Sequence, residues 1–247
     1  MQIQPPIINI FEKAVRKASK VLLRDFGEIE NLQIESKNLG DFVTNADLKT
    51  EKILLETLKY YYPSATFITE ESGTIVGDKE LIVIDPIDGT TNFIHGIPMV
   101  GIVISKIFKN EITDGIIFNP ILNEFYWSSK GKGSWCNNKR LRVSKRQNIS
   151  DCVIGTGIPH ANRVYQNYLN EIDNVSKNCS GLRRMGAASE KRARSNPAPA
   201  TGVVSERAVE LSTVTPFWTV TPEMQHDRSS RLQSGNQLAK NLTAVLF

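Results

Sequence analysis

Two carboxylates stand three residues apart in the first half of the chain. An apolar run of strand-forming residues ends at Asp85, and Asp88 follows three residues later. Hard cations such as Mg²⁺ prefer oxygen ligands. The two carboxylates, with the carbonyl of Ile87 between them, therefore predict a site for one or two such ions. A plain Asp-Gly loop without a metal is the alternative that this pattern alone leaves open.

The residues around these aspartates predict a tight turn and then a helix. Pro86 and Gly89 favour the turn, and a helix can begin at Thr90 or just after it. The backbone N–H groups of Gly89 and Thr90 would then face a bound anion such as a phosphate group.

Two further acidic elements lie upstream. Glu70 and Glu71 stand at the end of a predicted strand. Alone they are typical of a solvated loop, but beside Asp85 they offer a third metal ligand. Asp41 and Asp47 flank the start of a predicted helix, where either can act as a helix cap. For Asp47 the alternative is a base or orienting group for the attacking water.

The elements that position these residues follow from the apolar spacing. Residues at helical spacing predict helices over Ile7–Phe26, ended by Gly27, from Thr44 or Asn45 to Pro63, and over Arg163–Val175. Runs rich in Ile, Val and Phe predict strands at Thr66–Ile68, Leu81–Ile84, Val100–Phe108, Gly115–Phe118, Glu124–Ser128, Val153–Gly155 and Leu182–Met185. The alternation of helices and strands predicts a layered α/β domain.

The overall composition is that of a soluble globular protein. The chain has 247 residues, of which 40% are hydrophobic and 23% charged. Its formal net charge of +4 is too small to indicate a nucleic-acid partner by itself. Three cysteines without a CxxC pair favour reduced thiols in a cytosolic protein. Neither a signal peptide nor a membrane span is expected, so the predicted location is the cytoplasm.

The composition changes at about Glu190. Residues 1–189 contain 25 Ile, whereas residues 190–247 contain none. The basic residues change from 15 Lys and 8 Arg before this point to 2 Lys and 5 Arg after it. The second segment is rich in Ser, Thr, Pro and Arg, so we expect a poorly ordered tail that arose from a shifted reading frame or an inserted segment. A genuine divergent tail is the alternative.

The acidic elements, taken in order, resemble the inositol monophosphatase family. They are Asp-Phe-Val-Thr-Asn-Ala-Asp at 41–47, Ile-Thr-Glu-Glu-Ser at 68–72 and Asp-Pro-Ile-Asp-Gly-Thr-Thr-Asn-Phe at 85–93. The likeness continues to Arg-Arg-Met-Gly-Ala-Ala at 183–188, so residues 1–189 are expected to form the phosphatase domain. The resemblance implies an α-β-α-β-α sandwich and Mg²⁺-dependent hydrolysis of a phosphomonoester on a small polyol. Inositol 1-phosphate is the family's usual substrate, while sugar bisphosphates and nucleotide 3′-phosphates remain open.

The resemblance also implies roles for individual residues. Glu70, Asp85 and the carbonyl of Ile87 would hold one Mg²⁺, and Asp85 and Asp88 would hold a second. Thr90 and Asp47 would orient the attacking water, with Glu70 also in the catalytic set. The implied substrate contacts are Ile87, Asp88, Gly89, Thr90 and Arg184. Arg183 or Arg184 contacts the substrate or a second subunit of a homodimer, or is an ordinary surface residue.

The chain departs from the family in its last part. The family supplies a further metal-binding aspartate from a Trp-Asp-x-Ala-Ala-Gly motif, but here Trp218 is followed by Thr219, and Asp227 stands in Gln-His-Asp-Arg. The resemblance therefore predicts a site one carboxylate short and a reduced activity. Two other functions stay open. Some bacterial relatives act in transcription antitermination with protein and RNA partners, and an inactive product of a damaged gene is the third reading.

Overall fold

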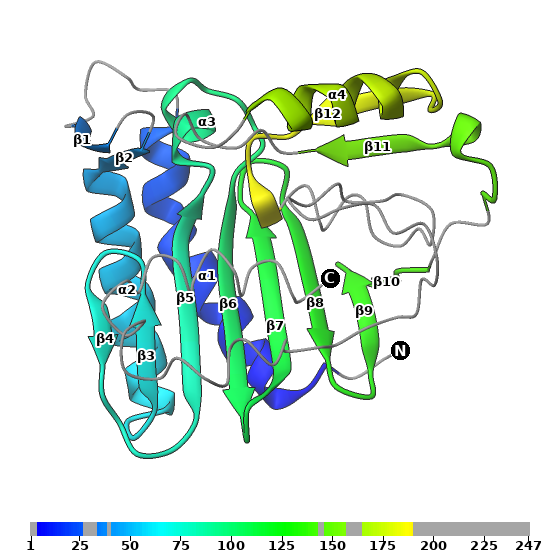
Figure 1. Ribbon diagram of the computed structural model, residues 1–247. Helices are drawn as coiled ribbons and strands as arrows, with labels where there is room; N and C mark the ends of the chain where they lie inside the picture. The colour runs from blue at the N-terminus through cyan, green and yellow to red at the C-terminus, as the bar shows by residue number, and fades with distance from the viewer. Residues whose placement is uncertain (1–3, 27–33, 39–40, 143–145, 157–164, 190–247) are drawn as a thin grey trace.

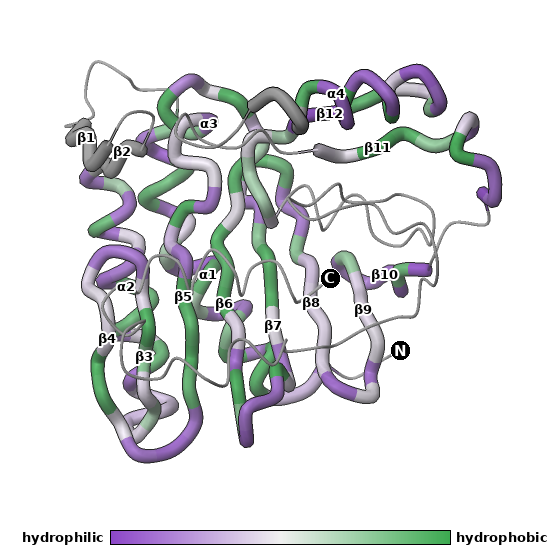
Figure 2. Tube along the Cα trace, viewed as in Figure 1, coloured by the Kyte–Doolittle hydropathy of each residue, from purple (hydrophilic) through white to green (hydrophobic). Residues whose placement is uncertain are grey.

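A computed structural model describes residues 4–26, 34–38, 41–142, 146–156 and 165–189 (Figure 1). Their centre is an eight-stranded mixed sheet. In spatial order its strands are β10 (Lys139–Arg140), β9 (Gly133–Cys136), β8 (Glu124–Ser129), β7 (Glu111–Asn119), β6 (Gly101–Phe108), β5 (Leu81–Asp88), β3 (Thr66–Thr69) and β4 (Gly73–Ile75). Neighbouring strands are antiparallel except β3 and β5, which are parallel. Strands β5, β6 and β7 are hydrophobic along most of their length, and the turn between β4 and β5 is hydrophilic (Figure 2).

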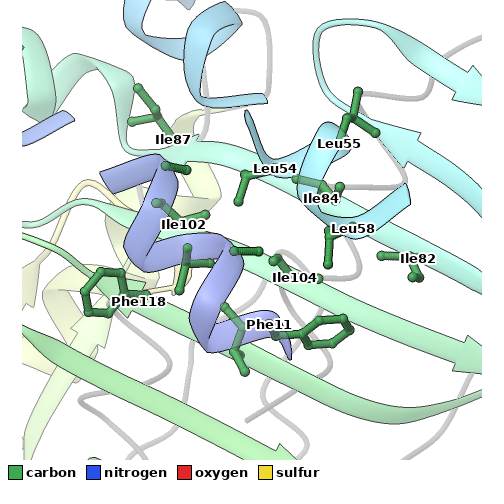
Figure 3. Packing of buried hydrophobic residues seen from close by; sticks show 14 of the residues in the cluster. Phe11, Leu54, Leu55, Leu58, Ile82, Ile84, Ile87, Ile102, Ile104 and Phe118 are labelled. Atoms are coloured by element: carbon green, nitrogen blue, oxygen red, sulfur yellow. The ribbon is translucent and has the colours of Figure 1, made fainter. Parts of the chain in front are cut away.

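Two long helices cover one face of this sheet (Figure 1). Helix α1 (Pro6–Asp25) begins with a proline, whose fixed φ suits the first helical turn and which needs no N–H partner there. Helix α2 spans Asn45–Tyr61. Both bury apolar residues at helical spacing against the even-numbered residues of β5 and β6. The side chains in this layer include Phe11, Leu54, Leu58, Ile82, Ile84, Ile102 and Ile104 (Figure 3).

The remaining described elements lie at the edge of the sheet where β5 ends (Figure 1). Strands β1 (Ile34–Asn38) and β2 (Asp41–Thr44) form an antiparallel pair that leads directly into α2. Helix α3 (Thr90–Ile94) follows β5. A second, parallel pair joins β11 (Val153–Thr156) to β12 (Gly181–Arg184), with α4 (Tyr165–Ser176) between them in the chain. A short 3₁₀ helix, η2 (Ile149–Asp151), precedes β11.

The predicted helices and strands are present, with some boundaries corrected. Strand β5 continues to Asp88 rather than ending at Ile84, because the chain pairs again with β6 beyond a bulge. Strands β1, β2, β4, β9 and β10 were not predicted. Gly27 and the tail after Ser189 lie outside the described residues. None of the helices that the structure describes has the length and apolarity needed to cross a membrane.

Candidate active site

Strand β5 carries Asp85 to the sheet face opposite the two long helices. Ile84 lies in the core under α1 and α2. Because side chains alternate along a strand, the next residue, Asp85, points the other way. Its partner across the ladder is Val103, which belongs to a separate apolar cluster with Ile117 and Tyr126. Asp85 is only 5% exposed, so its carboxylate is held in a nearly water-free position.

A bulge between Asp85 and Asp88 creates the turn that the sequence predicts. The register of β5 against β6 shifts there, and Asp88 pairs with Gly101. Gly89 then adopts a left-handed conformation with φ +95° just before α3. A Cβ at this position would lie 2.9 Å from the carbonyl oxygen of Met99. Both the backbone conformation and the close packing therefore require glycine here.

Glu70 reaches Asp85 because of the register between two parallel strands. Thr69, the last residue of β3, pairs with Ile84 on β5. Glu70 follows Thr69 and Asp85 follows Ile84, so the register brings the two carboxylates level at the same edge of the sheet. Glu70 is the first residue of the tight turn between β3 and β4. In addition to burial, the negative charge of Glu70 and a hydrogen bond between the two side chains raise the pKa of Asp85.

Asp47 and Thr90 form a hydrogen-bonded pair between α2 and α3. The Thr90 hydroxyl donates to Asp47 Oδ1 at 3.3 Å and lies 3.1 Å from the carbonyl oxygen of Ile87. Asp47 is in the first turn of α2 and is 2% exposed. The pair thus links the start of α2 to the turn that follows Asp85.

Asp85 is the electrostatic centre of this group. Burial raises the pKa of the Asp85 carboxyl well above its usual range, and the neighbouring charges of Glu70, Asp88 and Asp47 raise it further. Its Oδ1 atom is buried and has no hydrogen-bond partner in the described structure. A buried carboxylate with an unsatisfied oxygen and carboxylate neighbours is costly without a cation. The donor chemistry therefore fits a hard cation such as Mg²⁺.

Asp88 faces a different part of the chain. Its Oδ2 atom accepts hydrogen bonds from the backbone N–H of Ser189 at 2.6 Å and from the Ser189 hydroxyl at 2.5 Å, and its Oδ1 atom accepts the N–H of Ala188 at 3.2 Å. Ala188 and Ser189, which donate these hydrogen bonds, therefore form part of the wall of the site. Among the described residues, no three His, Cys, Asp or Glu side chains lie close enough together to hold a metal ion as they stand.

Arg184, which the resemblance implies as a substrate contact, lies on β12 and is exposed.

Two further residues near the site were given no role in the sequence analysis. Asn92 is buried and donates from its amide to the carbonyl oxygens of Met99 and Met185, both at 2.8 Å, so it joins the α3 loop to the segment after β12. Glu51 is buried on α2. A charged residue on the apolar face of a helix was the signal that could have revealed it.

Comparison with known proteins identifies this arrangement. Residues 4–193 match the model of the Inositol monophosphatase family. The chain belongs to the inositol monophosphatase family. An inositol-1-monophosphatase of Mesorhizobium japonicum is 41% identical over 185 residues, which cover 74% of this chain and 70% of that protein. The Nus factor SuhB of Escherichia coli is 33% identical over 186 residues, which cover 74% of this chain and 70% of that protein.

Solved structures agree with the family assignment. The crystal structure of the extragenic suppressor protein suhB from Bartonella henselae superposes with a TM-score of 0.72 at 40% identity. The superposition covers 76% of this chain and 73% of that one. The predicted α/β sandwich of the inositol monophosphatase type is therefore confirmed.

Proposed function

We propose that this chain hydrolyses a small phosphomonoester in a Mg²⁺-dependent reaction, with inositol 1-phosphate as the leading substrate. The observation that carries the proposal is the buried Asp85, whose orphaned oxygen lies among the charges of Glu70, Asp88 and Asp47. The family assignment and the inositol-1-monophosphatase at 41% identity support the same reaction.

The proposed metal ligands are those that surround this oxygen. Glu70, Asp85 and the carbonyl of Ile87 would hold one Mg²⁺, and Asp85 with Asp88 would hold a second. When bound, the cations neutralise charge on the phosphoryl and leaving oxygens and make water more acidic.

The chain's own groups orient the other reactants. The Thr90 hydroxyl already donates to Asp47, so its lone pairs can accept a hydrogen bond from the attacking water and hold that water in place. The N–H groups of Gly89 and Thr90 would bind the phosphate oxygens. As the water oxygen bonds to phosphorus, the P–O ester bond breaks. The leaving alkoxide gains one proton and the attacking water gives one up, so the products are the polyol and hydrogen phosphate.

Phosphate release from inositol 1-phosphate tests this function directly. The purified chain is expected to release phosphate when Mg²⁺ is present, to stop when EDTA removes the metal, and to recover when Mg²⁺ is added back. Colorimetric measurement of inorganic phosphate follows all three steps. Phosphate release that continues in dialysed, EDTA-treated protein would refute the proposed metal dependence.

Replacement of Thr90 tests the positioning of the water. Thr90→Val keeps the branched shape but removes the hydroxyl, so the rate should fall up to about 10²-fold through loss of geometry, with Mg²⁺ affinity little changed. Thr91→Val is the matched control, because Thr91 is in the same helix but exposed. Steady-state rates and calorimetric Mg²⁺ titrations measure the two effects. An equal loss in the Thr91 variant would show that α3 is merely disturbed.

The relatives named Nus factor SuhB support a second candidate function, a role of this chain as a Nus factor. This role would not require the carboxylate site. Asp85→Asn distinguishes the two functions, because it should lower phosphate release at least about 10³-fold and leave a Nus-factor role intact.

We also propose that the phosphatase domain ends near residue 189 and that residues 190–247 do not replace the family's last part. The family match ends at residue 193, close to the change in composition. The expected metal-binding Trp-Asp motif is absent from the sequence that follows.

A further inference from the structure

Glu51 is a buried carboxylate that the proposed reaction does not use. It lies on α2 one helical turn after Asp47, on the same face of the helix, and is 2% exposed. Within the described part of the chain, no Lys, Arg or His side chain forms an ion pair with it. A buried charge without a counter-ion persists only where strong hydrogen bonds compensate the loss of hydration.

The compensation comes from a single turn twenty residues away. Glu51 Oε2 accepts the backbone N–H of Glu71 at 2.9 Å, and Oε1 accepts the backbone N–H of Ser72 at 2.9 Å. The Ser72 hydroxyl donates to Oε1 as well. Successive N–H groups of a turn form a concave site for an anion. The Glu51 carboxylate is the anion in this turn, and hydrogen bonds to a charged acceptor are roughly twice as strong as neutral ones.

This turn carries Glu70. Thr69 pairs with Gly73, so Glu70, Glu71 and Ser72 form a three-residue connection between β3 and β4. Gly73 has φ +74°, the left-handed conformation that ends such hairpin loops. Because Glu51 holds the second and third residues, the first is also fixed relative to α2.

Without this anchor, Glu70 should no longer be held level with Asp85. The pairing of β3 with β5 ends at Thr69 and Ile84, so that ladder does not itself hold Glu70. The hydrogen bonds from Glu71 and Ser72 to Glu51 tie the turn to the same helix that carries Asp47.

We propose that Glu51 is a positioning residue: it anchors the Glu70–Ser72 turn to α2 and thereby holds Glu70 beside Asp85 for a divalent cation. This inference rests on the proposed cation site and adds the residue that keeps its ligands together. In this arrangement Glu51 acts through its hydrogen bonds to Glu71 and Ser72 and would not itself be a ligand of the cation.

Three variants of the full chain test the anchor, with Mn²⁺ as the probe. Glu51→Gln retains size but has only one acceptor oxygen, and its amide faces a donor N–H. Calorimetry well below each Tm should show Mn²⁺ binding weakened about 10- to 100-fold, as for other groups that orient metal ligands. Ser72→Ala removes one donor and should weaken binding about 2- to 10-fold. Glu56→Gln, at an exposed position of α2, should bind like the parent.

The outcomes separate positioning from simple stabilisation. A Glu51→Gln protein with a lower Tm but parental Mn²⁺ affinity would overturn the inference, as would a variant unchanged in both. If Glu51→Gln does not fold, Ser72→Ala provides the test, because this variant keeps both backbone hydrogen bonds to Glu51 and should still fold. Parental Mn²⁺ affinity in Ser72→Ala would then overturn the inference. A parent chain that binds no Mn²⁺ would refute the proposed cation site and this inference together, whereas parental binding with no response to either variant refutes the inference alone.

Discussion

Asp85→Asn is expected to abolish cation binding and to lower phosphate release at least about 10³-fold, the upper range for loss of one preorganised electrostatic group. Asp85 is the proposed ligand common to both Mg²⁺ ions, so its loss affects each of them. Calorimetric titration with Mn²⁺ and the phosphate-release assay measure the two effects. Parental affinity in this variant would show that Asp85 is not a ligand.

The same substitution should have the opposite effect on the stability of the cation-free protein. The Asp85 carboxyl is buried, one of its oxygens is unsatisfied, and three carboxylates surround it. Replacing it by a neutral amide relieves both the desolvation and the repulsion, so the free energy of unfolding in EDTA should rise by about 0.5–2 kcal/mol. Urea unfolding measures this free energy in EDTA and in Mg²⁺. Only the parent protein should be more stable in Mg²⁺ than in EDTA.

Asp114→Asn provides the matched control. Asp114 is another buried aspartate, on β7, and it accepts a hydrogen bond from the Ser129 hydroxyl at 2.7 Å. Its carboxylate is satisfied, so its replacement should destabilise the protein and leave cation affinity unchanged. If Asp85→Asn also destabilised the cation-free protein, the strain assigned to the carboxylate cluster would be wrong.

The local parts of the site were predictable from the sequence because local chemistry determines them. The Asp85–Asp88 turn follows from an apolar run, a proline and a glycine in succession. The start of α2 near Asp47 follows from a capping residue and helical spacing. Helix α1 follows from its apolar residues at helical spacing.

The parts that were missed depend on contacts between distant segments. Strand β5 continues past Pro86 because Asp88 pairs with Gly101 on β6, which no local pattern reports. The contact between Asp88 and Ser189 joins residues 101 positions apart. Glu51 accepts its hydrogen bonds from Glu71 and Ser72 only because the β3–β4 turn packs on α2. Short strands such as β9 lack a buried run, since all four of its residues are only partly buried.

A chain whose C-terminus is restored to the family pattern is expected to hydrolyse inositol 1-phosphate about 10²–10³-fold faster than this chain, the cost of one missing electrostatic contact at a developing charge. The family's downstream aspartate would complete the second cation site, which here relies on Asp85 and Asp88. Mg²⁺ dehydrates reluctantly, so a site with one anionic ligand fewer has a lower occupancy at a given concentration.

Ser189, the last described residue, belongs to the wall of the site. Its N–H and hydroxyl donate to Asp88, and its hydroxyl oxygen would lie only 2.7 Å from a Cβ on Gly101. Replacing residues 190–247 by a family segment with the Trp-Asp motif therefore changes the sequence directly after a residue of the site. Phosphate release is measured for both proteins, with Asp88→Asn in each as the blank. Rates within about tenfold of each other would contradict the predicted deficit, and would indicate that a carboxylate such as Glu223 or Asp227 supplies the missing ligand.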